Sequence, residues 1–197
     1  MKRIDAVLAA VVTSGAIAVS MPGVLQATTL KSVHDPLSRF MIAVPATWNV
    51  QTSTSTRAAA VTAKAPAGSG GLPDSVDVIV QDTFSPLSPQ ACVGEADTVM
   101  RFSIHRWTTI QQGPTTIGGF PAYARSYTWR APTGEQRRSI QSCVTMGRRA
   151  FMIVGTTADR PENVQRDLPQ LQQIMDTFRP ISSTLPQAPA TRSLGGK

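Results

Sequence analysis

The sequence predicts an α+β fold on three observations. The first is a run of four strands between Trp107 and Thr157, joined by short turns rich in glycine, which is typical of an antiparallel meander. The second and third are two amphipathic helices, expected before the meander at residues 89–103 and after it at residues 161–178. Their apolar stripes indicate that both helices pack against the sheet.

The expected strands follow from alternation and from the residues that end them. At residues 38–44 strongly and weakly apolar side chains alternate, and Pro45 ends the strand because it has no N–H group. Residues 75–81 are apolar on both faces, which indicates a central strand. Weaker extended segments precede it at residues 48–50 and 58–65. The meander strands are expected at residues 107–116, 120–129, 136–146 and 149–157.

Serine and proline residues indicate where the two helices begin or are interrupted. Ser88 can cap the first helix, and Pro89 suits its first turn, where a missing N–H group costs nothing. In the second helix Pro169 interrupts the apolar stripe. This helix is therefore expected either to kink there or to restart with Asp167 as its cap.

The N-terminus resembles a secretory signal peptide. The basic segment Met1-Lys2-Arg3 precedes an apolar run at residues 6–19, and Ala27 is a small residue suited to the last position before a cut. The run has about 14 residues, whereas a spanning helix needs roughly 20, which argues against an uncleaved anchor. We expect residues 1–27 to be a leader and the mature chain to be periplasmic or extracellular, with no transmembrane segment.

The remaining chain, about 170 residues, is long enough for one domain with its own core. We expect a single domain at residues 28–180. From residue 181 to 197 the chain is rich in Ser, Thr, Pro, Ala and Gly without an apolar period, which is typical of a disordered tail.

Two cysteines, Cys92 and Cys143, are present. In an exported chain an even pair is more often a disulfide than two free thiols or a metal site. Cys92 lies on the inward stripe of its helix and Cys143 in a meander strand, so that the two can meet. Such a bridge closes a loop of about 50 residues, for which the chain-entropy estimate is roughly 4 kcal/mol. The alternative is two buried free thiols.

The chain is basic, with a net charge of +7, and 15 of its 19 basic residues are arginine. The arginines are scattered, and only Arg137-Arg138 and Arg148-Arg149 are adjacent. A basic surface can attract anionic polymers or lipid headgroups, although it can also be merely solvated. Nucleic acid is not an expected partner, because the compartment is wrong and neither a recognition helix nor a zinc pattern is present.

No constellation of catalytic residues stands out. Neither His34 nor His105 has a partner at metal-ligand or base spacing, and Glu95 and Asp97 lie two apart on a helix, so that they point in different directions. A phosphate-binding glycine motif is also missing. We predict a non-enzymatic protein without a metal or cofactor. The alternative is an envelope hydrolase whose site is assembled from distant residues.

One expected strand carries a candidate binding face. In residues 120–129, alternation places Tyr123, Arg125, Tyr127 and Trp129 together on one face. Aromatic and arginine side chains are enriched at binding surfaces. In the alternative interpretation the four lie under a helix or pair across strands, with Arg125 extending to the rim. The partner is unknown, an envelope protein or an anionic ligand.

Three short segments, in their order, resemble a known family. They are Phe40 to Trp48, an apolar strand ending in Pro-x-x-Trp; Ile117 to Ala122, with two glycines; and a terminal helix ending at Phe178. Together they resemble PsbP-like domains, including bacterial envelope proteins related to DcrB and LpqN, over roughly residues 37–179. Lipoprotein members carry an acylated cysteine, which this chain lacks.

The resemblance implies an α/β/α sandwich, with a central antiparallel sheet of about six or seven strands flanked by two main helices. It also implies a non-enzymatic accessory or binding module, without catalytic residues to carry over.

Overall fold

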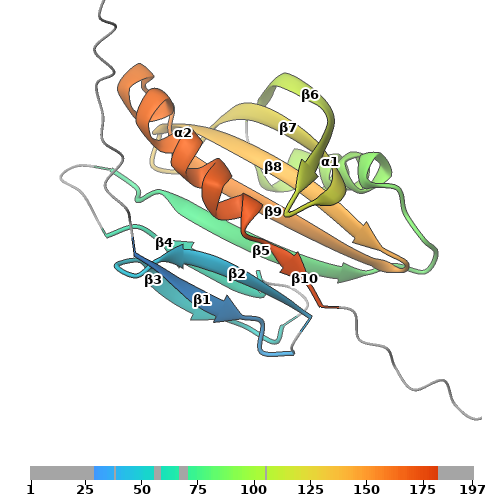
Figure 1. The fold of residues 1–197 in the computed structure, drawn as a ribbon. Helices are drawn as coiled ribbons and strands as arrows, with labels where there is room; N and C mark the ends of the chain where they lie inside the picture. Colours follow the sequence, from blue (N-terminus) through green and yellow to red (C-terminus); the bar gives the residue numbers. More distant parts are fainter. Residues whose placement is uncertain (1–28, 38, 56–58, 67–70, 105, 182–197) are drawn as a thin grey trace, which may run out of the picture.

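The largest element is an antiparallel sheet of seven strands in the order β3-β4-β5-β9-β8-β7-β6 (Figure 1). Long antiparallel ladders pair β5 with β9, β9 with β8, β8 with β7 and β7 with β6, and the register of the last pair shifts between Thr109 and Gln111. The strands are β3 (Asn49–Thr52), β4 (Val61–Lys64), β5 (Ser75–Asp82), β6 (Thr108–Ile117), β7 (Phe120–Arg130), β8 (Gln136–Met146) and β9 (Arg149–Ala158).

The computed structural model describes residues 29–181, apart from 38, 56–58, 67–70 and 105. The expected leader at residues 1–27 and the expected tail at residues 181–197, apart from Ile181, therefore lie outside the described residues. Within the described part of the chain, no helix is long and apolar enough to cross a membrane.

Different elements cover the two faces of the large sheet (Figure 1). Helix α1 (Pro89–Ser103) packs on β7 and β8 from one side. Helix α2 (Pro161–Asp176) packs mainly on β9 from the other side. A small sheet completes that second layer with β1 (Leu30–His34), β2 (Phe40–Pro45) and β10 (Arg179–Pro180), in the order β1-β2-β10.

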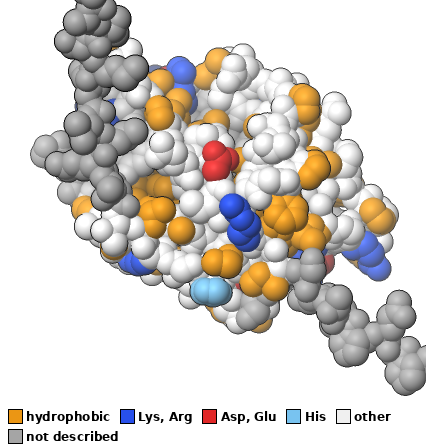
Figure 2. Space-filling view, viewed as in Figure 1, with side chains coloured by type: hydrophobic (Ala, Val, Ile, Leu, Met, Phe, Trp, Pro, Cys, Tyr) orange, Lys and Arg blue, Asp and Glu red, His pale blue; other side chains and the backbone are white. Residues whose placement is uncertain are grey.

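The main core lies between the large sheet, α2 and the small sheet. Its centre is three aromatic rings, with centroids 6.1 Å apart for Phe40 and Phe151, 5.5 Å for Phe40 and Phe178, and 5.3 Å for Phe151 and Phe178. All three side chains are buried. On the face of the molecule shown in Figure 2, lysine and arginine side chains stand apart from one another.

A disulfide between Cys92 of α1 and Cys143 of β8 confirms the predicted bridge. Their Cα atoms lie 6.3 Å apart, and the residues are 51 positions apart in the sequence. Val93, Ala150 and Tyr123 pack around the bridge as a second apolar cluster. The bridge therefore fastens α1 to the sheet.

The α+β fold class is confirmed, and the predicted and observed elements largely coincide. Helix α1 spans the predicted residues, and the Ser88 hydroxyl accepts a hydrogen bond from the Ala91 N–H at 3.1 Å, as a cap does. Helix α2 ends at Asp176, two residues earlier than predicted. Strands β1 and β10 were not predicted, since only Val33 of β1 is buried and β10 has two residues.

Of the two outcomes expected at Pro169, a kink or a restart with Asp167 as the cap, the restart is wrong. Helix α2 runs through Pro169 without interruption. The carboxylate of Asp167 is occupied by side chains: it accepts hydrogen bonds from Thr157, Asn163 and Arg166, so it does not act as a cap.

Candidate functional site

The four residues of the predicted binding face lie beneath helix α1. Tyr123 packs against the disulfide cluster, and Arg125 and Tyr127 are only 2 % and 3 % exposed. Trp129 is half-buried, and its indole N–H donates to the Ser139 hydroxyl at 2.9 Å. In the structure a helix covers this face, as in the alternative interpretation of the sequence. That interpretation also expected Arg125 to extend to the rim, whereas Arg125 is buried.

Arg125 joins α1 to the sheet. Its Nε and Nη2 donate to Oε1 of Gln141 at 2.9 and 2.8 Å, and its Nη1 forms an ion pair with Asp97 of α1. The guanidinium lies 5.1 Å from the Trp107 ring centre and 5.3 Å from that of Tyr127. A buried arginine needs such partners, because an unpaired charge in the interior is costly.

Beside α1 lies a groove of about 850 Å³, which we call the α1 groove. It forms because α1 covers β7 and β8, while β5 and β9 also turn side chains toward the same side of the sheet. Its apolar floor consists of Ile79, Met152 and Val154, all half-buried. The remaining apolar and aromatic lining comprises Ala59, Ala96, Met100, Ile104, Tyr127 and Trp129.

Asp77 is an acidic group in the lining of the α1 groove. Its carboxylate accepts hydrogen bonds from the hydroxyls of Thr62 at 2.6 Å and Ser75 at 3.2 Å. Burial raises the pKa of Asp77, although these bonds and the charge of Lys64 act in the opposite direction. Glu95 is the other acidic residue among the described lining, and none of those described residues is lysine or arginine. The groove is therefore acidic, although the chain is basic.

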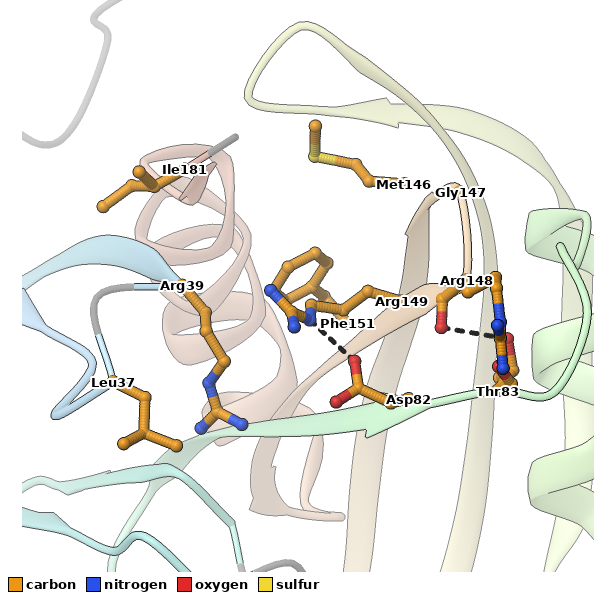
Figure 3. A pocket seen from close by; sticks show the side chains of 10 residues that line it. All are labelled: Leu37, Arg39, Asp82, Thr83, Met146, Gly147, Arg148, Arg149, Phe151 and Ile181. Atoms are coloured by element: carbon orange, nitrogen blue, oxygen red, sulfur yellow. Dashed lines mark hydrogen bonds and ion pairs between the residues drawn. The ribbon is translucent and has the colours of Figure 1, made fainter. Parts of the chain in front are cut away.

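A second pocket of about 750 Å³ lies at one end of the large sheet (Figure 3). We call it the arginine pocket because Arg39, Arg148 and Arg149 line it. Figure 3 shows Arg39 and Arg149 extending into it from opposite sides, with the ring of Phe151 behind Arg149. The other lining residues are Leu37, Asp82, Thr83, Met146, Gly147 and Ile181.

Carboxylates hold two of these arginines. The Arg39 guanidinium donates to both carboxylate oxygens of Asp35, at 2.7 and 2.8 Å. Burial would raise the pKa of Asp35, but the hydrogen bonds and charge of Arg39 outweigh it, and the pKa lies below its ordinary value. Arg149 pairs with Asp82 at 2.8 Å on the neighbouring strand.

His34, Glu95 and Asp97, the described titratable residues that the sequence analysis considered, have separate surroundings. Among the described residues, no group of three or more His, Cys, Asp or Glu side chains could hold a metal ion. His34 is exposed on β1, and His105 lies outside the described residues. Glu95 lines the α1 groove whereas Asp97 pairs with Arg125, so the two do point in different directions.

The sequence interpretation missed both pockets. It treated residues 75–81 as apolar on both faces, yet one face of β5 carries Asp77 and Gln81 beside Ile79. That polar alternation is the signal that could have found the α1 groove. The arginine pocket had a weaker signal, because its residues come from four separate segments.

No protein-family model matches the chain, and no curated protein matches it. Solved structures do. One is the cyanobacterial PsbP (CyanoP) from Synechocystis sp. PCC 6803, with a TM-score of 0.60 and 14% identity, over 83% of this chain and 99% of that one. Another is LpqN, involved in cell envelope biogenesis of Mycobacterium tuberculosis, with a TM-score of 0.55 and 16% identity, over 77% of this chain and 91% of that one.

The Ran-binding protein Mog1p of Saccharomyces cerevisiae is also similar, with a TM-score of 0.55 and 11% identity, over 79% of this chain and 97% of that one. At such low identities these likenesses concern the fold and carry no activity over. The seven-stranded sheet between two helices is therefore the PsbP-like fold.

Proposed function

We propose that this protein is an exported, non-catalytic binding protein of the cell envelope. Its ligand is elongated and mainly apolar, with a hydrogen-bond donor or a cation at one end, and it occupies the α1 groove. The observation that carries the proposal is the groove itself, an apolar cavity with an acidic group on its wall.

The size and chemistry of the α1 groove support a small ligand. Binding pockets are commonly about 300 to 1,000 Å³ and mostly apolar, with few polar groups that fix orientation. Ile79, Met152 and Val154 supply the apolar floor, and Asp77 supplies an acceptor with a raised pKa. When an amine or hydroxyl group of the ligand binds Asp77, the apolar remainder of the ligand contacts the apolar floor.

The same geometry argues against the envelope hydrolase. Hydrolysis by a serine needs a base beside the nucleophile and a third group that orients the base. The groove brings Ser139 and Thr156 within 2.9 Å of each other, and Trp129 also donates to Ser139. Among the described residues that line the groove there is no histidine.

Three observations support the envelope location. The chain begins with a segment that resembles a signal peptide, and it contains a disulfide, which persists in oxidising compartments. LpqN, which shares the fold, is involved in cell envelope biogenesis.

Filling the α1 groove should weaken ligand binding. The double substitution Ile79→Trp and Val154→Trp places two bulky rings on the half-buried floor. We expect the affinity for N-phenyl-1-naphthylamine, a neutral apolar probe with one N–H group, to fall at least about tenfold, as for a lost hot-spot contact. Fluorescence titration measures it.

The matched control is Ile110→Trp, an exposed apolar position on β6 outside the groove. It should bind the probe like the wild type. Thermal melts of both variants establish that they fold. A folded double variant with unchanged affinity would contradict the proposed site.

A further inference from the structure

We propose that the end of the sheet that carries the arginine pocket docks on the surface of an anionic phospholipid membrane. This surface is separate from the α1 groove and is made by the β5–α1 loop, the β8–β9 turn, the segment before β2 and the residue after β10.

The first support is a cation without an acidic partner. Arg148 donates through Nε to the carbonyl of Thr83 at 2.9 Å, and its two Nη atoms donate to no atom in the described part of the chain. Its neighbour Arg149 is paired with Asp82, whose carboxylate is largely exposed. A guanidinium with free donors matches the geometry of a phosphate group.

The second support is exposed apolar surface at the same end. Leu37 and Ile181, which line the arginine pocket, are 52 % and 37 % exposed, and Phe84, next to Thr83, is 99 % exposed. They are half of the six large hydrophobic side chains exposed in the described residues. Clustered exposed apolar side chains beside charges mark interaction sites rather than ordinary surface.

The third support is the link between the cation and the apolar side chain. The Thr83 N–H and hydroxyl donate to the Arg148 carbonyl at 2.7 and 3.0 Å, and Arg148 returns a bond to the Thr83 carbonyl. These three bonds tie the β5–α1 loop to the β8–β9 turn. These bonds therefore keep Phe84, which follows Thr83, and Arg148 at the same end of the sheet.

This combination fits a membrane better than a soluble anion. At an anionic surface arginines meet the phosphates while apolar side chains enter the boundary below the headgroups. Inorganic phosphate would engage the arginines but leave Phe84, Leu37 and Ile181 in water. The apolar side chains thus separate the two ligands experimentally.

The test is co-sedimentation of the purified protein with vesicles at 0.15 M salt. We expect binding to vesicles of phosphatidylcholine with about one-third phosphatidylglycerol, and none to phosphatidylcholine alone, because the surface attraction needs anionic lipid. Phe84→Ala should weaken binding about tenfold, as expected for a lost buried phenylalanine. Arg148→Ala should weaken it about fivefold, the effect of one basic residue.

The matched controls are Ile110→Ala and Arg130→Ala, both exposed and located toward the other end of the meander, where β7 turns into β8. They should bind vesicles like the wild type. Absence of binding to anionic vesicles, or equal losses in the controls, would overturn the proposal.

A second measurement separates the membrane from free phosphate. Phe84→Trp should shift its fluorescence to shorter wavelength with anionic vesicles and not with inorganic phosphate. Complete competition by millimolar phosphate, with no effect of Phe84→Ala, would show a soluble-anion site and sink the membrane proposal.

Discussion

At the scale of single residues, Arg125 shows how a side chain typical of binding surfaces can serve the interior. Its charge meets Asp97 of α1, its donors meet Gln141 of β8, and its planar group lies near two aromatic rings. Asp97 and Gln141 come from two different elements, a helix and a neighbouring strand. The side chain therefore sets the position of α1 on the sheet, and with it one wall of the α1 groove.

Replacement of Arg125 by alanine should destabilise the fold by about 3 to 5 kcal/mol, because a buried, paired side chain is lost and its cavity remains. The control is Arg130→Ala on the same strand, where the side chain is exposed and the expected change is within about 0.5 kcal/mol. Urea denaturation measures both. If Arg125→Ala kept its stability and lost only ligand binding, the residue would be a binding group as the alternation first suggested.

The candidate site shows what alternation can and cannot predict. A period of two placed Tyr123, Arg125, Tyr127 and Trp129 on one face of β7, and they do share a side. Alternation along one strand cannot say which element covers that face. That depends on the position of α1. Two contacts between residues distant in sequence fix this position: the Arg125–Asp97 pair, 28 residues apart, and the disulfide, 51 residues apart.

At the scale of elements, local signals predicted most of the structure. The bounds of α1 were predicted from the Ser88 cap and the proline in the first turn, and those of the meander from its glycine turns. Both predictions lie close to the observed bounds. The elements that were not predicted are those that form only through contacts with distant parts of the chain. Strand β1 exists because it pairs with β2 along five residues, although its own sequence is largely polar and exposed. Propensity cannot reveal such a strand.

The β6–β7 turn gives a test at this scale. Gly118 has φ 59°, and a Cβ there would collide with the carbonyl oxygen of Phe178 and the guanidinium of Arg179. Its neighbour Gly119 has φ 84°, but no atom lies within 4 Å of its would-be Cβ. Gly119→Ala should cost about 1 kcal/mol from the left-handed backbone alone.

Gly118→Ala should cost about 2 kcal/mol more, because the backbone of Phe178 and the side chain of Arg179 must also move. Denaturant midpoints of the pair measure the difference. Equal midpoints would mean that Phe178 moves away without cost, contrary to its packing in the core.

At the scale of the whole molecule, the two pockets differ in charge and in place. The α1 groove is acidic and lies beside α1, whereas the arginine pocket is basic and lies at one end of the sheet. A single protein could therefore rest on an anionic surface through one region and hold a ligand in another. The two proposals fail separately, since each has its own variants and its own probe.

The disulfide between Cys92 and Cys143 fastens α1, one wall of the α1 groove, to strand β8. The two cysteines are 51 positions apart in the sequence. Cys92→Ala with Cys143→Ala should destabilise the protein by roughly 4 kcal/mol through the entropy of the unfolded chain. It should also weaken binding of N-phenyl-1-naphthylamine, since α1 is a wall of the groove. Vesicle binding should persist, because the Thr83–Arg148 bonds do not involve α1. Urea titration and the two binding assays, with reduced wild-type protein as the control, measure these effects. A double variant that melts like the wild type and binds the probe equally well would show that side-chain packing alone positions α1.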